Sequence, residues 1–295
     1  MTTIKLILFT TFLNLSVHIT ADDNLTSYPA VADNPSYDSV TELTFIEAGK
    51  KIPYADDPNQ FGLLWSSETN AKDVLVVFLH GGCWLSAYDI VHTYPTTSAI
   101  FQAGFNVWSL EYRRTGETGG GWPTTYEDIK TGLKHIEMLS EEGITARHII
   151  IAGHSAGGHL AVLAGRDAKE IFASDVFGNE LKLDIIGLAA ITDIETYTAG
   201  ENGCQRAGVA FMGAPAAEQL GAYDSANPAK SNINTPITLL HGEADPIVPV
   251  TQMSEFSQPN VSKVMQPKAG HFDWVHPGTP AFTSFLSVLS KLTQP

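Results

Sequence analysis

Continuous apolar runs alternate with amphipathic stretches along most of this chain. The runs are short and rich in β-branched residues, which is typical of strands buried on both faces of a sheet. They lie at 73–79, 105–110, 149–151, 183–191, 236–240 and 261–265. Helical spacing of apolar residues predicts a helix near 126–142, and further helices are expected near 86–103, after Ser155 and at 280–292. This alternation predicts an α/β fold, with a mostly parallel central sheet flanked by helices.

Other segments depart from this pattern. Residues 41–47 and 60–66 predict two short strands, an antiparallel hairpin before the first long apolar run. Residues 194–235 lose clear periodicity and are rich in Gly, Ala and Asn, which favours a small lid. With this lid, residues 41–295 form one domain, and 43% hydrophobic residues suffice for a large core.

The first residues have the pattern of an export signal. Lys5 is the only charge in residues 1–21, an apolar run covers 4–19, and small residues precede the acidic Asp22. This pattern predicts a secreted or periplasmic protein whose mature chain starts with a loose segment at 22–40. The alternative is a buried N-terminal strand or helix.

Charge and cysteine content narrow the classes of partner. A net charge of −15 argues against nucleic acid and anionic membranes as partners. Cys83 and Cys204 lack metal-ligand spacing, so neither a metal nor another cofactor is expected. In an oxidising compartment the two cysteines can pair if their Cα atoms come close, which stabilises by about 4–5 kcal/mol in the entropic model.

The run Gly153-His154-Ser155-Ala156-Gly157 lies between a predicted strand and a predicted helix. Alone, the pattern Gly-x-Ser-x-Gly is common, and the structural alternative is a turn of small residues where a helix packs closely on a sheet. At a strand-to-helix junction it is typical of a nucleophilic serine on a sharp turn, with small residues needed two positions before and after it. Ser155 is therefore the predicted nucleophile.

A serine hydroxyl needs a base, and histidine suits that task. His271 follows the last strand in a polar loop and is the predicted base, with His276 as its rival. The orienting acid should follow the preceding strand, where Asp245 lies, with Glu243 as the alternative. The order Ser155, Asp245, His271 is the order of a nucleophile-elbow hydrolase.

An oxyanion intermediate needs N–H donors. The backbone of Ala156 supplies one, and Gly81 and Gly82 are predicted to supply others, although a Gly-Gly pair is also an ordinary tight turn. Three further histidines are assigned other roles: His80 shapes the glycine loop, His154 points elsewhere and His159 packs.

Aromatic and basic residues near these loops have two interpretations each. Trp84 and Trp122 lie on loops expected at the carboxyl edge of the sheet and are predicted to line a substrate pocket, with core packing as the alternative. Arg113 and Arg114 either bind a substrate carboxylate or form structural ion pairs, which is the favoured interpretation.

Together these motifs resemble the serine esterases of the α/β-hydrolase fold, in the branch that includes kynurenine formamidase-like and feruloyl or acetyl-xylan esterase-like proteins. The resemblance covers nearly all of residues 60–290. It is carried by His80-Gly81-Gly82-Cys83-Trp84, Glu111-Tyr112-Arg113-Arg114, Gly119-Gly120-Gly121-Trp122-Pro123, Gly153-His154-Ser155-Ala156-Gly157, Asp245-Pro246-Ile247-Val248-Pro249 and Gly270-His271. It implies a Ser-Asp-His triad, no metal, and a small or medium acyl substrate.

The residues therefore predict a carboxylic-ester hydrolase acting on small-molecule esters of short acyl or compact aryl type. An arylformamidase is the alternative, although Cys83 replaces an aromatic residue often found there and an export signal suits that enzyme poorly. A peptidase is disfavoured because no gating domain is recognisable. A non-catalytic binding module is the alternative from another class, but every catalytic position is filled.

Overall fold

The fold centres on one eight-stranded sheet. The computed structural model describes residues 25–71, 73–173 and 181–294, so the leader expected at 1–21 lies outside the described residues. The strand order is β1-β2-β4-β3-β5-β6-β7-β8; β2 runs antiparallel to both of its neighbours, β1 and β4, and all other neighbouring strands are parallel. The strands are β1 (Lys50–Pro53), β2 (Phe61–Trp65), β3 (Val74–Leu79), β4 (Asn106–Leu110), β5 (His148–His154), β6 (Lys182–Leu188), β7 (Ile237–Gly242) and β8 (Val261–Gln266).

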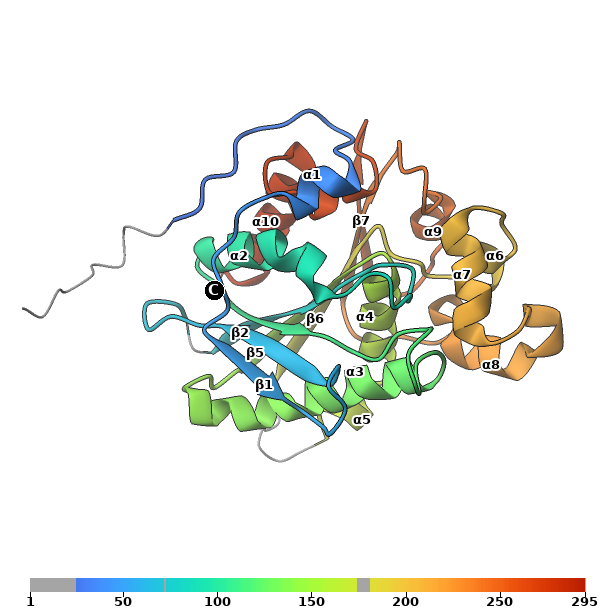
Figure 1. Cartoon of the computed structure of the whole chain (residues 1–295), viewed down its shortest axis with the longest axis horizontal. Coiled ribbons are helices and arrows are strands. Elements are labelled where there is room, and N and C mark those ends of the chain that lie inside the picture. The colour runs from blue at the N-terminus through green and yellow to red at the C-terminus, as the bar shows by residue number, and fades with distance from the viewer. Residues whose placement is uncertain (1–24, 72, 174–180, 295) are drawn as a thin grey trace, which may run out of the picture.

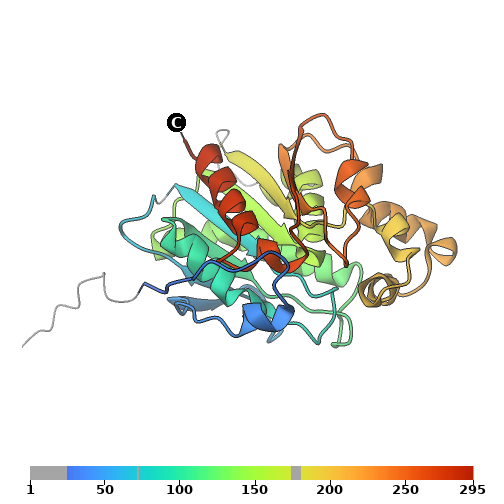
Figure 2. The same cartoon turned by 90° about the horizontal axis from the view of Figure 1, so that it is seen from above.

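Helices cover both faces of this sheet (Figures 1 and 2). One apolar cluster joins the sheet to α3 (Thr124–Lys134), the 3₁₀ segment η2 (His135–Glu142) and α4 (Ala156–Arg166), with the short α5 (Ala168–Ile171) beside them. A second cluster, on the opposite face, includes α2 (Tyr94–Gln102) and α10 (Pro280–Leu292). The predicted α/β-hydrolase fold is confirmed.

Residues 41–47 do not form the predicted strand. Instead, β2 pairs with β1, which starts at Lys50. Phe45 packs edge-on against Tyr94 at 5.1 Å between ring centroids, and the backbone of Ile46 bonds to Trp65 and Ser98. Phe45 and Ile46 of the predicted strand thus contact α2 and β2 instead of pairing with a neighbouring strand.

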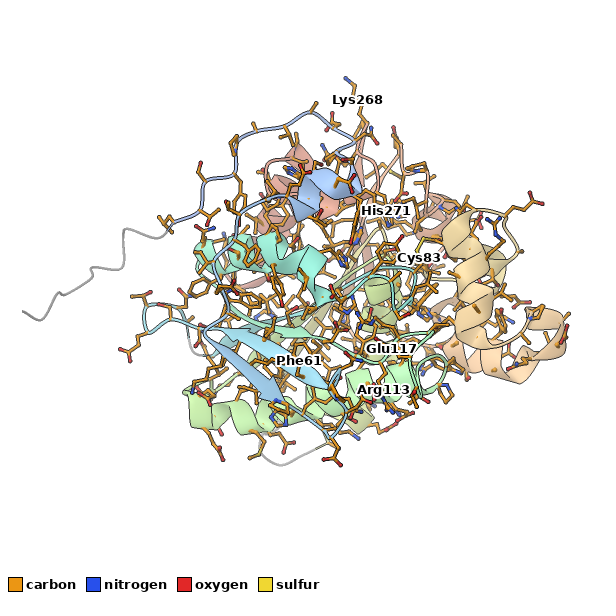
Figure 3. All side chains as sticks on the ribbon, viewed as in Figure 1. Phe61, Cys83, Arg113, Glu117, Lys268 and His271 are labelled. Atoms are coloured by element: carbon orange, nitrogen blue, oxygen red, sulfur yellow. A yellow bond between two sulfur atoms is a disulfide. The ribbon has the colours of Figure 1, made fainter. Side chains whose placement is uncertain are left out.

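The expectation of a loose segment is wrong for residues 25–40. The N–H of Thr26 donates to Gln102 in α2, and the N–H of Val31 donates to the carbonyl of Gly278. Asn34 bonds through its N–H to Asp273 and through its side chain to the carbonyl of Lys268, which Figure 3 places at the edge of the molecule. The short helix α1 (Tyr37–Thr41) follows. This segment is thus held against the loop that carries His271.

The segment expected to be a lid is a helical cap inserted between β6 and β7. It contains α6 (Ile194–Thr198), α7 (Gly203–Met212) and α8 (Leu220–Ala226), which lie together to the right in Figure 1. Their larger apolar side chains face inward, and Tyr197, Phe211 and Met212 are buried. The remaining short helix, α9 (Thr251–Ser254), follows β7. Within the described residues, no helix is long and apolar enough to cross a membrane.

Backbone contact between β3, β5 and α4 leaves no space for a side chain at Gly157. A Cβ atom there would lie 2.1 Å from the carbonyl oxygen of Leu79 and 2.3 Å from that of His80. At Gly153, a Cβ atom would lie 2.2 Å from the carbonyl oxygen of Gly157. Since all of these atoms belong to the backbone, the elements themselves must separate to admit a methyl group.

We expect Gly157→Ala to lower the free energy of unfolding by about 3 kcal/mol, because overpacking forces backbone shifts. Urea denaturation measures this change. Gly221→Ala is the matched control: nothing lies within 4 Å of a Cβ atom there. Gly221 is inside α8, so alanine should leave stability unchanged or raise it by up to about 1 kcal/mol. Equal stabilities for the two variants would contradict the close backbone contact.

Candidate active site

Ser155 occupies the sharp turn between β5 and α4. Its φ and ψ are 56° and −118°, so a non-glycine residue is held at positive φ. Its N–H donates to the carbonyl of Leu188 at 2.9 Å, and its carbonyl accepts from the N–H of His159 in α4. The turn therefore anchors Ser155 through both backbone groups and places it at the N-terminus of α4, whose dipole favours negative charge.

His271 and Asp245 form a hydrogen bond of 2.7 Å between Nδ1 and Oδ2. The other carboxylate oxygen accepts from the N–H groups of Ile247 and Val248 at 2.8 and 2.9 Å. A carboxylate here accepts from Nδ1–H, which leaves Nε2 of His271 available to take a proton. Burial raises the pKa of Asp245, but the adjacent His271 and the hydrogen bonds outweigh it, so that this pKa lies below its ordinary value.

Neither rival residue joins this pair. His276 is buried and its Nδ1 accepts from the N–H of Gly278 at 3.1 Å. Burial is the main cause of the lowered pKa of His276. Glu243 is exposed, and no bond joins its side chain to a histidine in the described part of the chain. The structure therefore brings together His271 and Asp245.

Ser155 and His271 line the same cavity, whose volume is about 170 Å³. The cavity lies at the carboxyl edge of the parallel strands, as expected for ligand sites in open α/β sheets. Its other lining residues are Tyr37, Gly82, Cys83, Tyr88, His92, His154, Cys204, Ile247 and Phe272. Figure 3 labels Cys83 and His271, which lie close together in this view, between the sheet and the cap.

The two glycines after β3 lie beside the nucleophile. A Cβ atom on Gly81 would lie 3.1 Å from the Cβ atom of Ser155, and Gly82 has a φ of 103°. Among the described residues, neither glycine N–H donates to another protein group. This arrangement leaves backbone donors free close to Ser155.

His154 has a role that the sequence did not predict. Its Nε2 donates to the carbonyl of His271 at 3.0 Å, and the two ring centroids lie 4.6 Å apart. Burial, together with the neighbouring His271, holds the pKa of His154 well below its ordinary value. The residue before Ser155 thus positions the backbone of His271. The only signal in the sequence was its place between Gly153 and Ser155, and this place does not show which way the His154 side chain points.

The prediction that Trp84 and Trp122 line the pocket is wrong. Trp84 is completely buried and stacks on Phe211 of α7 at 4.8 Å between ring centroids. Trp122 stacks on Tyr126 at 5.7 Å, and its N–H donates to the carbonyl of Phe211. Neither residue lines the cavity of Ser155. Phe211 of the cap packs against both rings, so the alternative of core packing holds for Trp84, and Trp122 packs partly buried against the same core.

Sequence comparison places this architecture in a family. Residues 63–259 match the BD-FAE family. The chain belongs to the BD-FAE family. Within the described residues, no group of three His, Cys, Asp or Glu side chains could hold a metal ion.

Relatives of this BD-FAE member include named esterases. The chain is 25% identical to the esterase LipC of Mycobacterium tuberculosis over 274 residues, which are 86% of this chain and 66% of LipC. It covers 44% of LipQ and 42% of LipM from the same organism, so it spans less than two thirds of each of these relatives.

Solved structures share the fold. A bifunctional GH43-CE protein of Bacteroides eggerthii superposes with a TM-score of 0.66 at 22% identity, over 82% of this chain and 38% of that one. An esterase from the archaeon Pyrobaculum calidifontis superposes with a TM-score of 0.64 at 15% identity, over 86% and 85% of the two chains.

Buried charges support the glycine loop of this BD-FAE member. His80 places Nδ1 at 2.8 Å from the carbonyl of Gly81 and Nε2 at 2.9 Å from Glu111. Glu111 also accepts from Arg114 and from the N–H of Ile90. Burial raises the pKa of Glu111, but the charges and hydrogen bonds of His80 and Arg114 outweigh it and lower this pKa. His80 thus shapes the loop, as predicted.

Arg113 and Arg114 both form structural ion pairs. Arg113 makes a bidentate contact with Asp128 at 2.6 and 2.8 Å, and Arg114 binds Glu117 at 2.7 Å as well as Glu111. Neither guanidinium lines the cavity of Ser155. The favoured interpretation of this arginine pair therefore holds.

We expect Glu111→Gln to lower the free energy of unfolding at pH 7 by about 3 kcal/mol, because it removes a buried carboxylate charge that pairs with Arg114 and bonds to His80. The folded-state pKa of Glu111 is lowered, so the stabilisation is complete above the unfolded value of about 4.3. It is lost as the pH falls through the folded-state value. The stability gap between wild type and variant should therefore narrow in acid, below about pH 4.3.

Denaturant titrations at a series of pH values measure this gap. Exposed Glu243→Gln is the matched control and should change stability by less than about 0.5 kcal/mol. A gap for Glu111→Gln that stays constant or widens in acid contradicts the ion-pair role.

Proposed function

We propose that this protein is a serine carboxylic-ester hydrolase that works through an acyl-enzyme on Ser155. The observation that carries the proposal is one cavity lined by a serine on a positive-φ turn and by a histidine whose Nδ1 is bonded to Asp245. The esterase names of LipC, LipQ and LipM support the same chemistry. Nothing in the site favours the formamidase alternative or a binding module.

In this mechanism, Nε2 of His271 takes the Ser155 proton as Oγ attacks the ester carbonyl. The N–H groups of Gly81, Gly82 and Ala156 bind the oxyanion that forms. His271 then gives its proton to the leaving alkoxide, and an acyl-serine remains. Water, deprotonated by His271, cleaves the acyl-serine by the same route. Asp245 holds the imidazole in place and stabilises its positive charge.

The cavity supports a short acyl or compact aryl ester as substrate. About 170 Å³ is available, and the rings of Tyr37 and Phe272 pack edge-on at 5.6 Å on one side of it. A lipase needs a broad exposed apolar face. In the described part of the cap, the large apolar side chains face inward, except Leu220. We therefore propose small esters in solution rather than lipid interfaces.

We also propose that the protein is exported. The charge and apolar pattern of residues 1–21 supports this, and so does the disulfide between Cys83 and Cys204, a bond that persists in oxidising compartments. A membrane partner after processing and a nucleic-acid partner are both disfavoured by the charge of −15.

We expect Ser155→Ala to lower kcat for p-nitrophenyl acetate by about 10⁴-fold or more while the unfolding curve stays that of a folded protein. His271→Gln should lose activity to a similar extent, because the base is gone. Steady-state kinetics and urea denaturation measure both effects. His276→Gln is the matched control and should keep most of the activity. Near-wild-type activity of Ser155→Ala rules out the serine mechanism.

We expect kcat/KM to be highest at about two to four acyl carbons, since each added methylene gains about 0.8 kcal/mol only where the pocket has room for it. A series of p-nitrophenyl esters measures this profile, with N-formylkynurenine as the comparison for amide cleavage. A rate that still rises at about eight carbons, or jumps when the substrate forms an emulsion, contradicts the proposed pocket. Faster cleavage of N-formylkynurenine favours the formamidase.

A further inference from the structure

A disulfide joins the glycine loop to the cap. Cys83 directly follows Gly82, and Cys204 lies in the first turn of α7. Their Cα atoms are 5.1 Å apart although 121 positions separate them in the sequence. Both cysteines line the cavity that contains Ser155 and His271. The bridge is therefore part of the cavity wall.

The loop at this bridge has an unfavourable backbone conformation. Cys83 and Trp84 have φ values of 52° and 58°, in the left-handed region that non-glycine residues rarely adopt. Such conformations persist only where the surroundings hold them. Neighbouring contacts do so: the N–H of Thr115 donates to the carbonyl of Trp84 and the N–H of Leu85 to that of Gly82.

Helix α7 contacts this loop at two places along one face. Cys204 bonds to Cys83 near the start of the helix, and Phe211 stacks on Trp84 near its end. Residues 204 and 211 are two turns apart and so lie on the same side of the helix. The Phe211 contact is fully buried, whereas the disulfide faces the cavity. Cleaving the disulfide therefore removes the covalent link at the end of α7 beside the cavity and leaves the buried Phe211 contact in place.

The position of the bridge assigns it to the acyl side. The leaving alcohol must face His271, whose ring packs against Phe272 at 5.2 Å, and Phe272 in turn contacts Tyr37. An ester with its carbonyl oxygen at the glycine loop and its alcohol at His271 then has the cap side of the cavity, where Cys204 lies, for its acyl chain. Cys83 and Cys204 form the wall next to that loop.

We propose that the Cys83–Cys204 disulfide determines acyl-chain length: it fixes the start of α7 as the end wall of the acyl pocket. The inference rests on the proposed ester hydrolysis and adds the residues that set its specificity. In the oxidised protein the cap is a fixed wall rather than a moving lid. Without the bond, the start of α7 withdraws while Trp84 and Phe211 keep the rest of the cap in place.

The test compares oxidised wild type, wild type reduced with a phosphine, and the Cys83→Ser/Cys204→Ser double variant. We expect the ratio of kcat/KM for p-nitrophenyl octanoate to that for the acetate to rise about tenfold or more in both bridge-free forms, because methylenes gain binding only where space opens. The reductant should not alter the ratio of the double variant further. An unchanged ratio in protein whose thiols are shown to be free overturns the proposal.

Met212→Ala is the matched control for a cap that is merely less stable. Met212 is buried in α7 and does not line the cavity. This variant should lower the free energy of unfolding by about as much as other core truncations while the octanoate-to-acetate ratio stays at the wild-type value. A rise in the ratio equal to that of the double variant shows that general loosening is sufficient and overturns the specific role of the bridge.

Hydrogen exchange gives a readout that needs no hydrolysis. Reduction should speed exchange of the hydrogen-bonded amides of Leu85 and Thr115 beside the bridge and of Gln205 and Arg206 in the first turn of α7, but not around Phe211. Absence of that change overturns the mechanical link even if esters are cleaved. Wild type that shows the exchange change but cleaves no ester in the series refutes the ester-hydrolase proposal instead.

Discussion

The positive φ of Ser155 is the constraint on which the rest of this structure depends. A serine keeps this conformation only because Gly153 and Gly157 let β5, α4 and the end of β3 meet backbone to backbone. The same contact brings Gly81 beside Ser155 and starts α4 directly after the nucleophile. The start of α4 and the position of the glycine loop thus both depend on the space that the absent side chains of Gly153 and Gly157 leave.

The parallel topology made most of this site predictable. Carboxyl ends of parallel strands share one edge, so residues that follow β3, β5, β7 and β8 had to converge there. Gly81, Ser155, Asp245 and His271 each follow one of these apolar runs, and each could be chosen from the sequence alone. The prediction of a strand at 41–47 was wrong because Phe45 and Ile46 contact α2 instead of pairing with a strand.

Residues whose environment comes from distant segments were not predictable in the same way. A tryptophan on a loop at this edge of the sheet, such as Trp84, is typical of a pocket wall. Only the position of Phe211 in the cap shows that Trp84 is buried. Tyr37 reaches the cavity because residues 25–40 are tied to the loop after β8, where Asp273 accepts from both Gly270 and Asn34. The periodicity of a sequence predicts which residues of one helix or strand are buried. It does not predict which distant segment covers them.

Two segments outside the sheet, the N-terminal segment and the cap, complete the walls of the site. The elbow and the triad loops belong to the sheet, but the walls of the cavity come from the N-terminal segment, through Tyr37, and from the cap, through Cys204. The sheet therefore sets the positions of Ser155, His271 and the backbone N–H groups of the glycine loop. The two attached segments add Tyr37 and Cys204 to the walls and so limit the size of the cavity. Within one fold, these attachments can change substrate choice without moving Ser155, since neither contributes to the backbone contacts that hold the elbow.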